Sequence, residues 1–253
     1  MDLANLPAPT FTAVDGLTQG TAALVYVAIG AAAWLRAPRD IRTRVFCAFS
    51  IANFVVFGVP TFWWLRGFSD PTKLPPAATA TVMAALGVGT LMLFHFTQVF
   101  PRRRPWIRDS GAQMAIGYVL VPLVIAGLIR FLPESLDKLT APYIIALIVF
   151  GFPLLVLLAF VLPVAGVVSL LRSYREFREG PLSILRRPLE WILLSQIAGG
   201  TLAILFAPVL AVLAPNSLLQ SVLTVVIWAL GLMTPIAFAL AVFKFKVLDL
   251  NPD

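Results

Sequence analysis

The sequence predicts an all-α membrane protein, a bundle of seven transmembrane helices with the amino terminus outside and the carboxyl terminus in the cytoplasm. Two observations lead to this prediction. Hydrophobic residues make up 60% of the 253-residue chain and charged residues 12%, and the mean hydropathy of +0.93 is far above that of a soluble domain. The basic residues gather in alternate connections between long apolar segments. A water-soluble core is therefore excluded.

Seven apolar segments are long enough to cross a bilayer, because about 20 helical residues span a hydrocarbon core of about 30 Å. They divide the chain into an extracytoplasmic tail (1–16), a transmembrane domain (17–243) and a short cytoplasmic tail (244–253). We expect the spans at residues 17–35, 43–65, 77–100, 112–132, 143 to about 171, 189–213 and 218–243.

The first span is expected to be a retained anchor rather than a cleaved signal peptide. A signal peptide carries basic residues before its apolar run, whereas here Asp2 precedes the run and Arg36 follows it. The second span holds the chain's one cysteine, Cys47, which cannot form an internal disulfide. We expect Cys47 to be a small packing residue.

Prolines mark the boundaries of the later spans. Pro75 and Pro76 precede the third span and Pro101 follows it, while Pro133 follows the fourth. Pro215 separates the sixth span from the seventh. These positions support the count of seven.

The fifth span differs from the others, because its helical pattern continues past the membrane to Glu179, where Gly180-Pro181 stop it. Arg175 and Glu179 are four residues apart, a spacing that stabilises exposed helix. The extension is either a solvated helix end or part of a cytoplasmic docking surface. The residues expected to form such a surface are Arg175, Glu179, Lys244 and Lys246.

The orientation follows from the basic residues, because Lys and Arg near span ends collect on the cytoplasmic side. The first, third and fifth connections are rich in arginine, whereas the amino-terminal tail has none. The basic residues of these connections are Arg36, Arg39, Arg42 and Arg44, then Arg102, Arg103, Arg104 and Arg108, then Arg172, Arg175, Arg178, Arg186 and Arg187. The net charge of +7 is the ordinary bias of such a protein, and no nucleic-acid partner is implied.

Prolines inside the spans free backbone carbonyl groups that lipid cannot satisfy. Neighbouring helices or bound water must satisfy them, so we expect a packed bundle with bent helices. These prolines are Pro60, Pro122, Pro153, Pro163, Pro208 and Pro235.

Few polar groups lie within the spans, and such groups mark a functional site by default. His95 and Glu190 lie at similar depth near the cytoplasmic side, and a contact between them would make a proton-sensitive latch. Asn53, Gln98 and Gln196 are the candidates to line a ligand pocket. Hydrogen bonds to the backbone, to water or between helices explain all five residues equally well, so both interpretations stay open.

Several function classes lack the residues that they require. The chain has no histidine pair or cysteine cluster for a metal or haem, and its four lysines lie at or beyond span ends, where none can hold retinal. No enzyme motif and no acidic residue near the middle of a span occurs. We expect no enzymatic activity and no cofactor.

Three short stretches resemble the seven-helix input domains at the amino end of bacterial sensor histidine kinases and related signalling proteins. Residues 93–101 (LFHFTQVFP), followed by RRRPW, resemble the exit of the family's third helix. Residues 186–194 (RRPLEWILL) resemble the start of its sixth helix. Residues 239–250 (ALAVFKFKVLDL) resemble the exit of its last helix, which leads to cytoplasmic signalling domains.

The resemblance implies a sensory input domain in the bacterial inner membrane. It would bind a ligand or sense a membrane state and relay the change through its last helix to a cytoplasmic signalling partner, which by analogy it would meet as a homodimer. The chain has no kinase domain after Asp249. We therefore expect either an excised sensor module or a protein that acts through a partner.

A different class of function fits the composition equally well. The chain would then be a structural or accessory subunit of a larger membrane complex, with wide apolar outer faces for partner helices and lipids and no internal polar pocket. A sensor instead predicts a cavity that reaches Asn53, Gln196 or His95. A small transporter is a third interpretation, but the internal repeats that would support it are not evident.

Overall fold

A computed structural model describes residues 13–68, 74–101, 111–130, 140–177, 185–198 and 218–245. These residues form helices joined by short turns, and none of them forms a strand. The predicted all-α class is therefore confirmed for the described part of the chain. Most of the predicted sixth span (189–213) lies outside the described residues.

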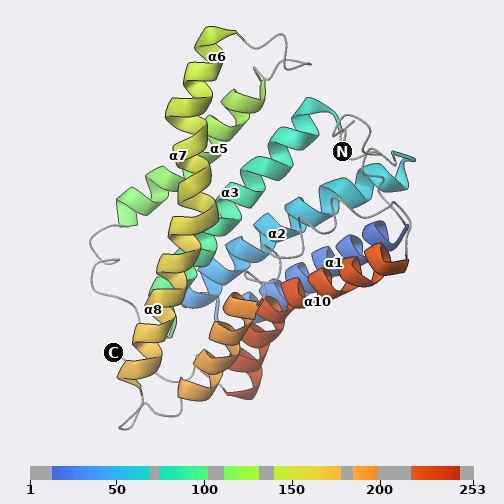
Figure 1. The fold of residues 1–253 in the computed structure, drawn as a ribbon. Coiled ribbons are helices and arrows are strands. Elements are labelled where there is room, and N and C mark those ends of the chain that lie inside the picture. Colours follow the sequence, from blue (N-terminus) through green and yellow to red (C-terminus); the bar gives the residue numbers. More distant parts are fainter. Residues whose placement is uncertain are drawn as a thin grey trace.

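The described helices follow one another along the chain in antiparallel pairs (Figure 1). They are α1 (Ala13–Arg36), α2 (Ile41–Leu65), α3 (Pro76–Val99), α5 (Gly111–Arg130), α6 (Ala141–Ala146), η4 (Leu147–Gly151), α7 (Phe152–Val156), η5 (Leu157–Val161), α8 (Leu162–Glu176), α10 (Leu218–Ala239) and η7 (Leu240–Lys244). Residues 186–198 are also helical.

Five helices in the described residues are long and apolar enough to cross a membrane. They are Ala13–Arg36, Ile41–Leu65, Pro76–Val99, Ala141–Glu176 and Val222–Lys244. The apolar part of α5, Met114–Arg130, is shorter. By the length and composition of its helices, the chain is a membrane protein.

Helix boundaries follow local sequence signals. Asp40 caps α2, because its side chain accepts a hydrogen bond of 2.8 Å from the backbone N–H of Arg42. Proline stands at the first position of α3, where no intrahelical N–H is needed. Helix α1 begins at Ala13, one turn before the expected span. One predicted boundary was wrong, because α8 ends at Glu176 rather than at Glu179.

The long helix Ala141–Glu176 widens into a π-helical turn before each of its two inner prolines. The turns η4 and η5 end directly before Phe152-Pro153 and Leu162-Pro163, and the N–H groups of Phe152 and Leu162 donate to carbonyls five residues back. Proline cannot donate to the carbonyl four residues before it, and a π-turn accommodates that loss. At Pro153 and Pro163 the structure therefore shows a local widening of the helix.

Helix α3 is the centre of the arrangement. It packs against α2, α5 and α8, while α1 lies between α2 and α10. Figure 1 shows α6 and the end of α5 diverging from α1, α2 and α10. Glycines allow two of the close approaches: a Cβ on Gly30 would lie 2.6 Å from the Ser50 Cβ of α2, and one on Gly87 would lie 2.8 Å from side chains of α5.

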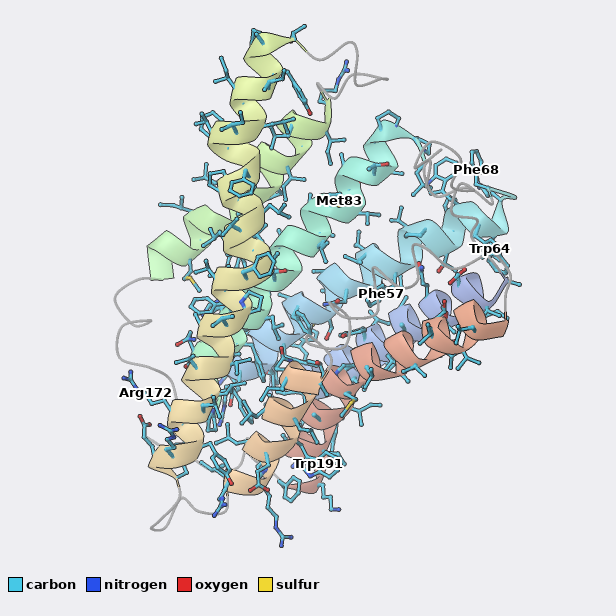
Figure 2. All side chains as sticks on the ribbon, viewed as in Figure 1. Phe57, Trp64, Phe68, Met83, Arg172 and Trp191 are labelled. Atoms are coloured by element: carbon cyan, nitrogen blue, oxygen red, sulfur yellow. The ribbon has the colours of Figure 1, made fainter. Side chains whose placement is uncertain are left out.

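Burial is concentrated at one end of the bundle, where α1, α3, α8 and η7 end and α2 begins. We call this the basic end, because most of the described basic residues lie there: Arg36, Arg39, Arg42, Arg44, Arg172, Arg175, Arg186, Arg187 and Lys244. Arg66 and Arg130 lie at the opposite end. Figure 2 shows the two ends, with Arg172 and Trp191 at the basic end and Trp64 and Phe68 at the other.

Two identical substitutions are expected to have opposite effects on stability. Gly30→Ala forces α1 away from α2, so the free energy of unfolding should fall by about 1–3 kcal/mol. A Cβ at Gly58 would have the Phe54 ring, at 3.8 Å, as its nearest neighbour. Gly58→Ala should therefore raise the free energy of unfolding by up to about 1 kcal/mol, because alanine favours helix. Thermal unfolding in detergent measures both. Equal shifts for the two variants would contradict the observed packing of α1 on α2.

Candidate functional site

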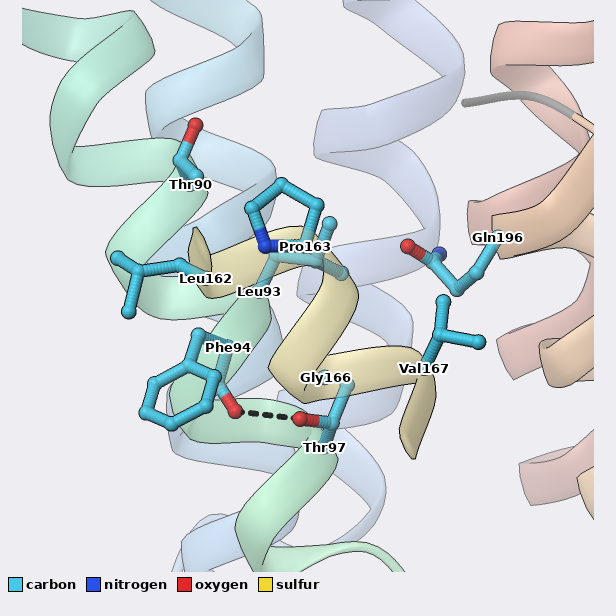
Figure 3. A pocket seen from close by; sticks show the side chains of 9 residues that line it. All are labelled: Thr90, Leu93, Phe94, Thr97, Leu162, Pro163, Gly166, Val167 and Gln196. Atoms are coloured by element: carbon cyan, nitrogen blue, oxygen red, sulfur yellow. Dashed lines mark hydrogen bonds between the residues drawn. The ribbon is translucent and has the colours of Figure 1, made fainter. Parts of the chain in front are cut away.

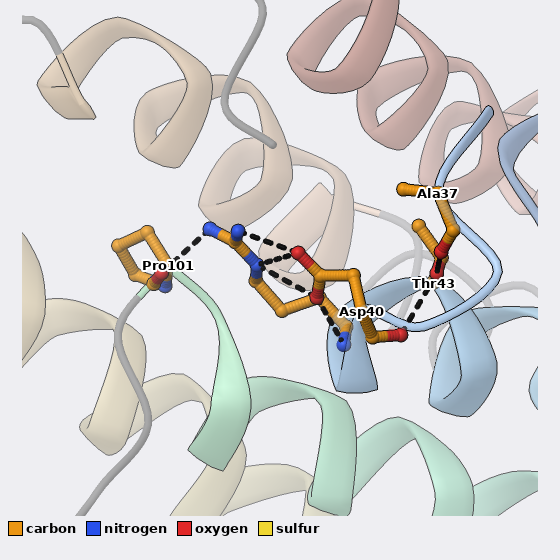
Figure 4. Close-up of polar contacts among 5 residues, drawn as sticks. Ala37, Asp40, Thr43 and Pro101 are labelled. Atoms are coloured by element: carbon orange, nitrogen blue, oxygen red, sulfur yellow. Dashed lines mark hydrogen bonds and ion pairs between the residues drawn. The ribbon is translucent and has the colours of Figure 1, made fainter. Parts of the chain in front are cut away.

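Arg42, at the start of α2, pairs with the α2 cap Asp40 and connects this helix start to the end of α3 (Figure 4). The guanidinium of Arg42 lies 2.6 Å from the Asp40 carboxylate and donates a second hydrogen bond, of 3.2 Å, to the backbone carbonyl of Pro101. The Arg42 side chain is only 10% exposed. The hydrogen bond to Pro101 therefore holds the start of α2 against the end of α3, and the pairing with Asp40 compensates the charge of the buried guanidinium.

The same turn is closed by a threonine. The Thr43 hydroxyl donates to the carbonyls of Ala37 and Asp40, and Thr43 is fully buried. The turn between α1 and α2 is thus fixed to α2, and α2 to α3. The sequence placed Arg42 only in the basic loop and gave no role to Asp40. An aspartate directly before an apolar helix was the signal that identifies the cap.

Four phenylalanines form a junction directly inside this ion pair. Phe46 of α2 stacks on Phe238 of α10 with ring centroids 3.7 Å apart, and Phe96 meets Phe238 edge to face at 5.1 Å. Phe100 stacks on Phe96 at 5.1 Å. All four rings are at most 1% exposed. This aromatic junction couples the last described helix to α2 and α3.

A polar clamp joins α8 to the helical residues 186–198. The Tyr174 hydroxyl donates to the Glu190 carboxylate at 2.9 Å and accepts from the Arg186 guanidinium at 2.8 Å. Arg186 and Glu190 also form an ion pair of 3.3 Å. The hydrogen bond from Arg186 to Tyr174 raises the pKa of the guanidinium.

Gln196 lines a small cavity among α3, α8 and residues 186–198, and so does Thr97, the neighbour of Gln98 (Figure 3). Gln98 accepts a 3.1 Å hydrogen bond from Ser169 of α8 and donates to Thr97. Gln196 donates to Thr234 of α10 at 3.0 Å. The cavity volume is about 10 Å³, which is about enough for one water molecule. Gln98 and Gln196 therefore form hydrogen bonds that join neighbouring helices.

In the structure, His95 and Glu190 have partners other than each other. His95 Nδ1 shares a hydrogen bond with the Tyr118 hydroxyl of α5, whereas Glu190 bonds to Tyr174 and Arg186. The two residues face different neighbours, so they do not form the proposed latch. The tyrosines that hold them, Tyr118 and Tyr174, carried no spacing signal in the sequence that singled them out.

The remaining ligand candidate, Asn53, bonds within its own helix. Its amide donates to the Phe49 carbonyl at 2.9 Å, and its nitrogen lies beside Gly89, 3.8 Å from where a Cβ would stand. Asn53 therefore marks the place where α2 approaches α3, rather than the wall of a pocket in the described residues.

The candidate docking residues lie only partly within the described chain. Arg175 is exposed near the end of α8, and Lys244 is exposed at the end of η7, with its ammonium 5.8 Å from the centre of the Phe245 ring. Glu179 and Lys246 lie outside the described residues. Two of the four expected docking residues thus lie on the surface of the basic end, where a partner has access.

No family model matches this chain, and no curated protein matches it. The resemblance to sensor input domains thus stays a prediction from residues. In the described part of the chain, no group of three or more His, Cys, Asp or Glu side chains is arranged to hold a metal ion.

Loss of the buried ion pair should be far more costly than loss of an exposed arginine. Arg42→Met leaves the Asp40 carboxylate without its cation and removes the side-chain donor to the Pro101 carbonyl, so the free energy of unfolding should fall by about 3 kcal/mol. Arg44→Met is the matched control. Arg44 is exposed and donates only to the nearby Pro38 carbonyl, so its replacement should change stability by less than about 0.5 kcal/mol.

Denaturant titration of the two variants in the same detergent measures the difference. A loss of equal size in Arg42→Met and Arg44→Met would mean that Arg42 does not hold α2 to α3.

Proposed function

We propose that this chain is a sensory input domain of the bacterial inner membrane, without enzymatic activity, that relays a change in the membrane or in a bound ligand to a cytoplasmic signalling protein. In this proposal the chain crosses the membrane seven times, with its amino terminus outside and the basic end in the cytoplasm. The aromatic junction is the observation that supports the relay most strongly.

The junction supports a relay because a packed core is not continuously deformable. Phe238 of α10 is fully buried against Phe46 and Phe96, so a shift of α2 or α3 must either move α10 or break this packing. The helix then continues through Ala241 and Val242, both fully buried, to the exposed Lys244. A change inside the bundle would thus reach the surface of the basic end.

The long helix Ala141–Glu176 supports a second route to the same surface. Its 36 residues would extend about 54 Å, more than the roughly 40–45 Å of a whole bilayer with headgroups. The excess at the α8 end carries Arg172 and Arg175, and the Tyr174 clamp connects it to residues 186–198. A cytoplasmic partner would meet α8 and η7 together.

The size of the interior cavity favours one kind of stimulus. The space beside Gln196 holds about one water molecule, which leaves no room there for a soluble ligand. Gln98 and Gln196, two of the groups expected to line a pocket, bond to Ser169 and Thr234 instead. A stimulus that arises in the bilayer is therefore the better fit to the proposed sensor.

One observation favours a different function, that of an accessory subunit in a larger membrane complex. The most apolar window of the helix Ala141–Glu176 has no buried residue, so its large side chains face outward on nearly all sides. Exposed residues on this helix include Ile145 at 61%, Phe150 at 58%, Phe152 at 65% and Phe160 at 55%. Lipid, a second copy of this chain or the helices of another subunit would cover such a surface.

Cysteine labelling tests the proposed orientation. In a Cys47→Ala background, Arg66→Cys and Arg130→Cys should react with a membrane-impermeant maleimide in intact cells, because both exposed positions lie at the end opposite the basic end. Arg175→Cys should react only after the membrane is permeabilised. The reverse pattern would place the basic end outside and refute the proposed route to a cytoplasmic partner.

The proposed function predicts a partner that depends on the basic end. We expect the affinity-tagged chain, purified from native membranes in mild detergent, to bring down a cytoplasmic kinase or response protein identified by mass spectrometry. Arg175→Gln combined with Lys244→Gln should reduce its recovery at least several-fold, since both cations are exposed there. Arg130→Gln removes a charge at the opposite end and should leave recovery unchanged.

The alternative function gives a different result in the same experiment. A stoichiometric set of other membrane proteins, recovered equally with the double variant and with Arg130→Gln, would refute the signalling role and identify the chain as an accessory subunit.

A further inference from the structure

An open apolar groove lies between α2 and α3, at the end of the bundle opposite the basic end. Its volume is about 530 Å³, within the range of about 300–1,000 Å³ typical of small-molecule sites. The walls include Phe54, Gly58, Phe62 and Trp63 of α2 and Ala77 and Ala78 of α3. The small residues create the space, and the aromatic rings border it.

The chemistry of the walls selects a hydrocarbon occupant. The residues that form the groove are apolar except for one threonine, and Phe54 and Phe62 remain 40% and 48% exposed. Water gains few hydrogen bonds in such a space. In a helix pair that crosses a membrane, the groove is open to lipid, and an acyl chain would cover the exposed rings.

A cation stands at the mouth of the groove. Arg66 follows the last residue of α2, and its guanidinium lies 4.6 Å from the centre of the Phe62 ring, which is itself part of the wall. Arg66 is exposed, so its donors are accessible to a ligand. A guanidinium binds phosphate with two parallel hydrogen bonds, and this position at a helix end is level with lipid headgroups.

We propose that the groove between α2 and α3 binds one acyl chain of an anionic phospholipid, and that Arg66 binds the phosphate of its headgroup. The apolar wall would contact the acyl tail, and the cation at its end would contact the headgroup of the same lipid. The proposal does not depend on a signalling role, because a lipid bound here would serve a sensor or an accessory subunit alike.

A second groove provides the matched comparison. It lies between α5 and α6, has a volume of about 580 Å³ and includes Gly127, while Arg130 ends α5 nearby. Among the described residues, a cation–π contact holds Arg66 on the wall of its groove, and none is observed for Arg130. The groove between α2 and α3 is therefore the one in which a cation is held directly against the apolar wall.

Native mass spectrometry of the full chain tests the proposal. The protein is purified in mild detergent and exposed to phosphatidylglycerol or phosphatidylcholine with identical acyl chains. We expect one phosphatidylglycerol molecule per chain to be retained, with about a tenfold preference over phosphatidylcholine. Both lipids carry the phosphate, but the choline cation of phosphatidylcholine offsets the attraction of its headgroup to the Arg66 guanidinium. Arg66→Gln should remove this preference. Gly58→Leu, whose Cβ has room, should reduce retention of both lipids about tenfold by filling the groove.

The controls are Arg130→Gln and Gly127→Leu, which make the same changes at the second groove and should retain the lipid as the wild type does. A Cβ on Gly127 would have no atom within 4 Å, so the substitution is tolerated there too. Retention of the wild-type preference by Arg66→Gln would overturn the proposal, as would an equal loss in the controls. Because Arg66 is exposed, its variant decides the question even if Gly58→Leu does not fold.

Discussion

The close packing of α2, α3 and α10 at the basic end is the constraint on which the rest of the structure depends. Phe46, Phe96, Phe100 and Phe238 contact one another directly, and the buried Arg42–Asp40 pair closes the junction on the side of the charged surface. Aromatic packing supplies contact area, while Arg42 fixes which helix ends meet. Every other described helix is positioned relative to this junction.

Away from the junction the helices are held by fewer and weaker contacts. α5 meets α3 through the hydrogen bond between Tyr118 and His95, and α6 meets α5 through the bond from the Tyr143 hydroxyl to the Leu128 carbonyl. Grooves of about 530 and 580 Å³ remain open at this end. A region with few buried contacts opens more easily, so the fold combines a fixed end with one that can respond to the bilayer.

The sequence predicted the class and most helix boundaries, because length, hydropathy and proline positions are local properties. It could not predict partners across helices. His95 and Glu190 were paired on depth alone, and depth does not say which faces of two helices meet; their partners proved to be Tyr118 and Tyr174. Gln98 and Gln196 make hydrogen bonds between helices, an interpretation that the sequence left open beside a ligand pocket.

Distances between spin labels test the central claim that the basic end is fixed and the opposite end is looser. In a Cys47→Ala background in lipid nanodiscs, one label pair replaces Arg44 and Lys244 at the basic end, and a second replaces Leu65 and Arg130 at the other, all exposed positions. Pulsed electron paramagnetic resonance should give a narrow distance distribution for the first pair and a clearly broader one for the second. Equal widths, or a broader distribution at the basic end, would contradict the account.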